Sequence, residues 1–182
     1  MRIDGRALIA AFELNPSEHT RRATLGAGAV TSRAVLHGLW LLPMGIPVRA
    51  DEIPAMKRRR LRESSHFAAE TEAGFQRLYS PACIVRAVAF AGSDATRCVE
   101  HAMRFPPIVQ RVVVTEEGRP APNEVRRLAV EFGVGMIELR ERDYVVLEQP
   151  PEPVVGVPAV YRWWIGELAY EAWLQLSAQP VS

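Results

Sequence analysis

The chain has 182 residues, of which 48% are apolar and 24% charged, values that are ordinary for a globular protein of one domain or two small ones. A formal net charge of +1 excludes a polycation, so nucleic-acid binding would require a local basic patch. Cys83 and Cys98 are too few for a disulfide framework, and neither a secretory signal nor a membrane-spanning apolar run is recognisable. We therefore expect a cytoplasmic protein without a membrane partner.

The first third of the chain predicts several short helices. Residues 5–14 are apolar and fit either a short helix or a buried strand, and the pattern leaves that choice open. Pro16 and Ser17 begin a second predicted helix, and Thr31 or Ser32 can cap a third that extends to Leu42. With the extended stretch 46–49, this order is similar to a helix-turn-helix with a wing, in which residues 31–48 would supply the reading helix and strand. Helices that pack only for stability are the alternative.

The densest positive charge lies in the run KRRRLR, residues 57–62. Arginine side chains can bind phosphate groups through two parallel hydrogen bonds, so the run predicts contact with nucleic acid. The candidate residues are Lys57, Arg58, Arg59, Arg60 and Arg62, together with Arg33. A solvated helix face, balanced by Glu63, Glu70 and Glu72, is the alternative. The next residues, 64–79, predict a helix, and we expect a boundary between a helical region 1–78 and a second region 79–182.

The second region predicts alternating strands and helices. Residues 84–91 predict a strand covered on both faces, Asp94 a helix cap, and residues 111–115 a second strand. Asn123 can cap a further helix that Gly133 closes, and strands at 134–141 and 143–149 follow. We expect an α/β fold with a mixed, partly parallel sheet flanked by helices.

The C-terminal stretch YRWWIGELAYEAWLQL, residues 161–176, predicts a helix that is apolar around much of its circumference. Such a helix either covers the core or leaves aromatic side chains free for a protein partner, which could be a second copy of the chain. The candidate interaction residues are Trp163, Trp164 and Trp173.

The order of elements from residue 84 to residue 139 resembles the restriction-endonuclease-like, or PD-(D/E)XK, nuclease superfamily. In that family an acid after a proline and an E-x-K on the next strand hold Mg²⁺ and the attacking water. At the matching positions this chain has Ala82 after Pro81, and Ala89 and Ala91 before Gly92. Glu100 and Phe105 match the positions of a helix glutamine and an aromatic residue. Hydrolysis of a phosphodiester needs carboxylates around a hard cation, which alanine cannot supply.

These observations predict a nucleic-acid-binding or complex-assembly protein on a catalytically degenerate nuclease-like core, without a cofactor. One alternative is an active Mg²⁺-dependent nuclease built around Glu13, completed by Asp4 or Glu18, which requires residues 7–14 to be a strand. A third reading is a protein-interaction module that does not bind nucleic acid.

Overall fold

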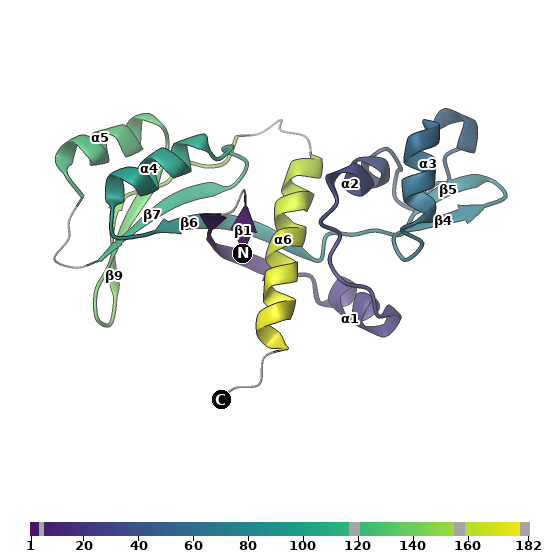
Figure 1. Ribbon diagram of the computed structural model, residues 1–182, viewed down its shortest axis with the longest axis horizontal. Helices are drawn as coiled ribbons and strands as arrows, with labels where there is room; N and C mark the ends of the chain where they lie inside the picture. The colour runs from purple at the N-terminus through teal and green to yellow at the C-terminus, as the bar shows by residue number, and fades with distance from the viewer. Residues whose placement is uncertain (4–5, 117–120, 155–158, 179–182) are drawn as a thin grey trace. The chain divides into compact units, whose positions relative to one another are not determined.

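The computed structural model describes residues 1–3, 6–116, 121–154 and 159–178 (Figure 1). The chain divides into two compact units. The first unit consists of residues 1–12 and 85–157, and the second consists of residues 13–84 and 158–182. The division differs from a single boundary at residue 79 because the C-terminal helix α6 (Ala159–Ser177) packs on α2 (Arg33–Trp40), in the N-terminal part of the chain.

A five-stranded sheet has the order β3-β6-β7-β8-β9. Its strands are β3 (Ile9–Leu14), β6 (Cys83–Ala91), β7 (Gln110–Glu116), β8 (Gly135–Leu139) and β9 (Tyr144–Glu148). β7 is parallel to both β6 and β8, whereas β9 returns antiparallel to β8. The predicted α/β class with a mixed, partly parallel sheet is confirmed.

Helices α4 (Ala95–Arg104) and α5 (Asn123–Glu131) connect the parallel strands. The Asp94 side chain caps α4 as predicted, by accepting a hydrogen bond from the Arg97 backbone at 3.1 Å. Gly133 follows α5 with a positive φ of 62°, also as predicted. Asn123, however, is the first residue of α5, and Pro122 occupies the cap position without a side-chain bond.

Buried Arg111 on β7 binds the C-terminal ends of α4 and α5. Its guanidinium donates hydrogen bonds to the carbonyls of Ala102 and Phe105 at the end of α4. It also donates to the carbonyls of Phe132 and Gly133 after α5. One cation therefore satisfies carbonyl groups at the negative ends of two helix dipoles.

Both helices lie on the same side of β6 and β7 (Figure 1). On that side Val88 and Phe90 are buried, and the rings of Phe90 and Phe105 are 6.0 Å apart. Ala91, on the other face of β6, is exposed. Cys83 and Val85 on that same face are buried, and the Cys83 thiol donates to the Gly166 carbonyl of α6 at 3.0 Å, so the second face is covered in part.

The N-terminus is extended. β1 (Arg2–Ile3) and β2 (Arg6–Ala7) pair antiparallel, and β3 follows as an edge strand of the sheet. Residues 9–14 thus form a strand and not a helix. The alternation of exposed and half-buried side chains along β3 fits an edge strand, where β6 supplies pairing partners for its backbone.

The second unit contains α1 (Pro16–Leu25), α2, the short 3₁₀ helix η1 (Ala50–Glu52), α3 (Ala55–Arg62), the strands β4 (Ala68–Thr71) and β5 (Gly74–Arg77), and α6. Asn15 caps α1 and Ser32 caps α2, each by accepting a hydrogen bond from the backbone of the first turn. An apolar core joins α2, α3, the hairpin β4–β5 and α6, and it includes Leu36, Leu39, Leu61, Phe75 and Val160.

The helix predicted for residues 64–79 is wrong, because this segment forms the antiparallel hairpin β4–β5. Gly74 begins β5 with φ of 126°, and a Cβ there would lie 2.0 Å from the Val48 carbonyl oxygen. The backbones of Val48 and Phe75 exchange two hydrogen bonds of 2.8 Å. Tertiary pairing with the stretch before η1 therefore overrides the local preference of the alanines and glutamates for a helix.

Candidate nucleic-acid interface

The basic run forms helix α3, and only Leu61 of this helix is buried. Leu61 packs against Gly38 of α2, where an added Cβ would lie 3.3 Å from its side chain. Glycine lets the two helices approach closely at this point, and the remaining residues of α3 are exposed or half-buried. Five of the eight residues of α3 carry a positive charge.

Short elements of the second unit precede and follow α3 in the chain. Helix α2 and η1 precede it, and the hairpin β4–β5 follows it. Val48 and Met44, between α2 and η1, form isolated bridges with Phe75 and Arg77 of β5. We call residues 33–77 the helix–hairpin module. Its hairpin follows the basic helix α3, whereas we expected the reading helix at residues 31–42. Those residues form α2, which has one face buried in the core.

The basic side chains of α3 have different partners. Arg58 donates to the carbonyl of Ala50 at 2.7 Å and so holds η1. Arg62 binds both carboxylate oxygens of Glu70 on β4, at 2.7 and 2.8 Å. Arg59 donates through Nε to Glu63 at 2.9 Å.

The remaining predicted residues differ in position. Arg60 lies 3.7 Å from the second carboxylate oxygen of Glu63, and Lys57 is half-buried on the same helix. The structure thus brings Lys57 and the four arginines together on one helix. Arg33 is not on this helix; it begins α2 and lies 3.7 Å from the ring centre of Trp164.

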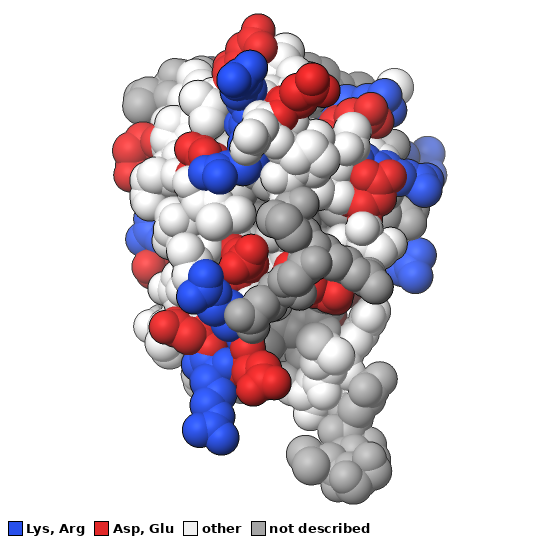
Figure 2. Space-filling view, turned by 90° about the vertical axis from the view of Figure 1, so that its left-hand side faces the viewer, with Lys and Arg blue, Asp and Glu red and all other residues white. Residues whose placement is uncertain are grey.

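Charge elsewhere is mixed. On the face of the molecule in Figure 2, acidic and basic side chains are interspersed, without a large area of one sign.

Exposed ion pairs such as Arg62–Glu70 stabilise a protein by only about 0–1 kcal/mol. Arg62 can therefore exchange Glu70 for a phosphate group at low cost.

The three predicted interaction tryptophans are half-buried, and each has a partner within the second unit. The rings of Trp163 and Tyr79 are tilted by 48° with their centres 5.1 Å apart, and Arg77 lies 5.1 Å from the centre of the Trp163 ring. The ring centres of Trp173 and His19 are 5.0 Å apart.

Arg77 Nε is buried and has no hydrogen-bond partner among the described residues. Burial lowers the pKa of Arg77.

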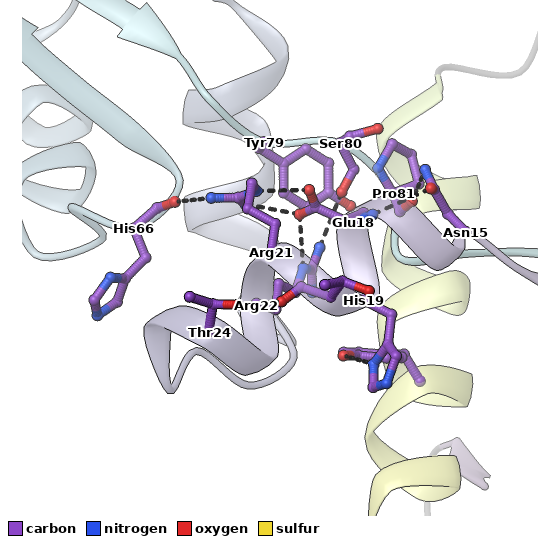
Figure 3. Close-up of polar contacts among 12 residues, drawn as sticks. Asn15, Glu18, His19, Arg21, Arg22, Thr24, His66, Tyr79, Ser80 and Pro81 are labelled. Carbon is purple, nitrogen blue, oxygen red and sulfur yellow. Dashed lines mark hydrogen bonds and ion pairs between the residues drawn. The ribbon is translucent and has the colours of Figure 1, made fainter.

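A buried ion cluster, defined here as Glu18, Arg22, Tyr79 and Glu167, lies in the same unit. Arg22 Nε donates to Glu18 at 2.8 Å (Figure 3). Its two terminal nitrogens bind the two oxygens of Glu167 on α6, at 2.7 and 2.8 Å. The Tyr79 hydroxyl donates to Glu167 at 2.9 Å. The cluster thus ties α1 to α6 and to the segment before β6.

The electrostatics of the cluster favour its charged form. Burial alone would raise the pKa of Glu18, but hydrogen bonds and charge from Arg21 and Arg22 outweigh it and lower that pKa. Burial alone would lower the pKa of Arg22, but Glu167 and Glu18 raise it. Burial and then the Glu167 carboxylate raise the pKa of Tyr79, so its hydroxyl stays protonated and donates.

Sequence reasoning missed this cluster. The four-residue spacing of Glu18 and Arg22 was a detectable sign of a helical pair. An isolated acid within an apolar aromatic stretch, as in IGELAY around Glu167, was the other available signal. Neither signal indicates that Arg22 and Glu167 meet, because they lie 145 residues apart in the chain.

A cavity of about 310 Å³ lies at the carboxyl ends of β6 and β7. Small ligands of open α/β sheets bind at this end of the strands. The Asp94 carboxylate already caps α4 there, and the hydroxyl of buried Thr115 donates to the carbonyl of Ile137 at 3.3 Å. The residues that line the cavity include Gly92, Ser93, Asp94, Thr96, Thr115 and Glu116.

The positions matched to the nuclease resemblance lie around β6. Ala82 is buried just before the strand, while Ala89 and Ala91 pair with Val112 and Val114 of β7. None of these three side chains has an oxygen that could bind a metal. Among the described residues, no group of three or more His, Cys, Asp or Glu side chains could hold a metal ion.

The alternative site around Glu13 has one of its requirements met, since residues 9–14 are a strand. Glu13 is exposed on β3. Both oxygens of Glu18, its proposed companion, are bound by Arg21 and Arg22. Asp4, the other proposed companion, lies outside the described residues.

Comparison of the chain with models of protein families, with curated proteins and with solved structures gives no match. The interface is therefore interpreted from its own geometry. Within the described part of the chain, no helix is long and apolar enough to cross a membrane.

Proposed function

We propose that the helix–hairpin module binds duplex nucleic acid and that α3 enters the major groove. The observation that carries this proposal is an exposed helix with five cationic residues, followed directly by a two-stranded hairpin. The order of a core helix, a second short helix, an exposed basic helix and a hairpin is similar to that of a helix-turn-helix with a wing. The major groove of B-DNA is wide enough to admit an α-helix.

In this proposal the side chains of α3 have separate tasks. Lys57 and Arg60 neutralise phosphates, and Arg58 holds η1 through the Ala50 carbonyl. The α/β unit, which we propose to be a catalytically degenerate nuclease-like core, acts as a scaffold or binds a further partner. Phosphate contacts of this kind make affinity strongly dependent on salt.

Binding of a fluorescent duplex DNA at several salt concentrations tests the proposal. The test variant replaces Lys57, Arg59 and Arg60 with alanine, which leaves the contacts of Arg58 and Arg62 intact. The control replaces three exposed arginines of the first unit, Arg97, Arg104 and Arg127, and removes the same charge. We expect the α3 variant to lose most binding and to show a shallower salt dependence. Absence of binding by the wild type at low salt, or equal losses in the two variants, would overturn the proposal.

A second candidate function is assembly with a protein partner. Four large apolar side chains are exposed within a few residues at the end of α2: Trp40, Leu41, Met44 and Ile46. Where such side chains form one continuous surface, that surface is typical of an interaction site. Light scattering tests self-association. Replacing Met44 and Ile46 with serine would dissociate an oligomer formed there, whereas a wild-type monomer would contradict self-association through this surface.

The nuclease alternative around Glu13 is favoured by one observation, that residues 9–14 form a strand. Incubation with plasmid DNA and Mg²⁺ or Mn²⁺, beside a Glu13→Ala variant, separates this activity from binding alone. Cleavage that the variant lacks would support a nuclease.

A further inference from the structure

The residues of α3 that point farthest from the core are Met56 and Arg59. At about 100° per residue, they lie roughly 140° and 160° around the helix from buried Leu61. Met56 is 78% exposed, and the Arg59 side chain is 82% exposed. If α3 enters a groove with Leu61 facing the protein, these two side chains reach the floor of the groove before any other in the helix.

Arg59 differs from Arg58 and Arg62 because both of its terminal nitrogens stay available. It differs from Arg60 because a hydrogen bond holds its side chain, whereas Arg60 only lies 3.7 Å from Glu63. Arg62 uses Nε and Nη2 on Glu70, and Arg58 uses Nη1 on the Ala50 carbonyl. Arg59 donates only through Nε, to Glu63, and its two terminal nitrogens have no hydrogen-bond partner among the described residues. The bond to Glu63 restrains the side chain while both terminal nitrogens remain free.

This arrangement fits the edge of a guanine base. Guanine presents two adjacent acceptors, O6 and N7, in the major groove, and a planar arginine can donate to both at once. Restraint of the arginine before binding reduces the conformational entropy that would otherwise be lost. A phosphate can also accept two hydrogen bonds from an arginine, so a preference among bases, and not affinity alone, distinguishes the two contacts.

Met56 is the apolar counterpart. Its exposed thioether chain lies in the first turn of the most basic helix of the chain, where it gains little from water. Thymine has a methyl group in the major groove, and apolar side chains contact it. Since residues three apart on a helix are neighbours, Met56 and Arg59 would contact adjacent bases.

We propose that α3 reads sequence and does not only bind phosphate: Arg59, oriented by Glu63, recognises a guanine, and Met56 contacts the methyl group of a neighbouring thymine. This inference rests on the proposed function of the helix–hairpin module. It assigns direct base contact to Arg59 and Met56, and a positioning role to Glu63.

Selection from a pool of duplex DNA with a randomised central stretch tests the inference. We expect the wild type to enrich a motif that contains guanine beside thymine. Arg59→Lys keeps the charge but loses the planar fork, so preference for the guanine should fall by about tenfold or more while affinity for the unselected pool changes little. The matched control, Arg62→Lys, should enrich the wild-type motif.

Two further measurements examine the individual contacts. Replacing the motif thymine with deoxyuridine removes only the methyl group, which should weaken binding of the wild type but not of Met56→Ala. Glu63→Gln should weaken the guanine preference even though the loss of a negative charge raises affinity for the pool. A purely electrostatic role for Glu63 would raise affinity and leave the preference unchanged.

The outcomes separate the two proposals. If the wild type binds the pool and enriches no motif, or if Arg59→Lys enriches the wild-type motif, base reading is wrong and phosphate binding by the module stands. If the wild type does not bind the pool at low salt, both proposals fail. Circular dichroism of each variant verifies that the exposed substitutions leave the fold intact.

Discussion

Arg22 and Glu167 form a buried, two-fold hydrogen-bonded ion pair that joins the first helix of the second unit to the last. Neither side chain is more than 1% exposed. Arg22 also binds Glu18, so its removal would leave Glu167 buried without its cationic partner and Glu18 with Arg21 alone. The pair therefore matters for stability because of what remains when one member is lost.

We expect Arg22→Met to lower the free energy of unfolding by about 3–5 kcal/mol, the usual cost of breaking a buried pair. Urea denaturation followed by circular dichroism measures it. Arg49→Met is the control, because the Arg49–Asp51 pair is largely exposed and should cost no more than about 1 kcal/mol. Equal effects of the two substitutions would show that the buried pair has no special role.

Stability should fall in acid through Glu18. Its pKa in the folded protein is lower than the ordinary value of 4.5. The resulting stabilisation is fully present above that value and is lost as the pH falls through the folded-state pKa. Unfolding free energies between about pH 6 and about pH 3 should therefore decline less steeply in Glu18→Gln than in the wild type. Glu171→Gln, an exposed change on α6, should follow the wild-type slope.

Gly74 should tolerate no side chain. Its φ of 126° and the 2.0 Å approach of the Val48 carbonyl both oppose a Cβ at this position. We expect Gly74→Ala to cost at least about 2 kcal/mol and to disrupt the hairpin β4–β5. Gly28→Ala is the matched control, since no atom lies within 4 Å of its added Cβ. A thermal melt that shifts equally for both variants would contradict the close contact.

Glu70 should limit the affinity of α3 for DNA. It binds Nε and Nη2 of Arg62, and Glu70→Gln would weaken that pair and free the cation for a phosphate. We expect a several-fold gain in affinity and a salt slope that is steeper by up to about 0.9, the effect of one added phosphate contact. Glu171→Gln makes the same charge change away from α3. An equal gain in this control would indicate only a net-charge effect.

Much of the first unit could be predicted from the sequence because its signals are local. Asp94 marks the start of a helix by a side-chain cap, and Gly133 marks the end of a helix by its positive φ, and both signals depend only on nearby residues. The apolar runs that connect the helices are short, which favours strands. The terminal helix α6 was equally clear, although its aromatic residues surround the axis and gave no sign of which face is buried. The basic run forms one helix, and its role as an interface stays a prediction.

The wrong helix at residues 64–79 and the open choice at residues 5–14 have a common physical origin, which is pairing between distant segments. The alanines and glutamates of residues 64–79 favour a helix locally. In the folded chain, however, the Val48 N–H donates to the Phe75 carbonyl and the Phe75 N–H donates to the Val48 carbonyl, and only an extended Phe75 can make both bonds. Residues 9–14 form a strand because they pair with β6, which lies far along the chain. No local pattern contains this information.

Arg111 has a consequence for the motions of the first unit. Since a single guanidinium holds the last carbonyls of α4 and those after α5, neither helix can fray at that end without weakening the other. Backbone amides in the last turns of α4 and α5 should therefore exchange with deuterium at similar rates. In Arg111→Lys, whose ammonium cannot span both ends, the two rates should diverge.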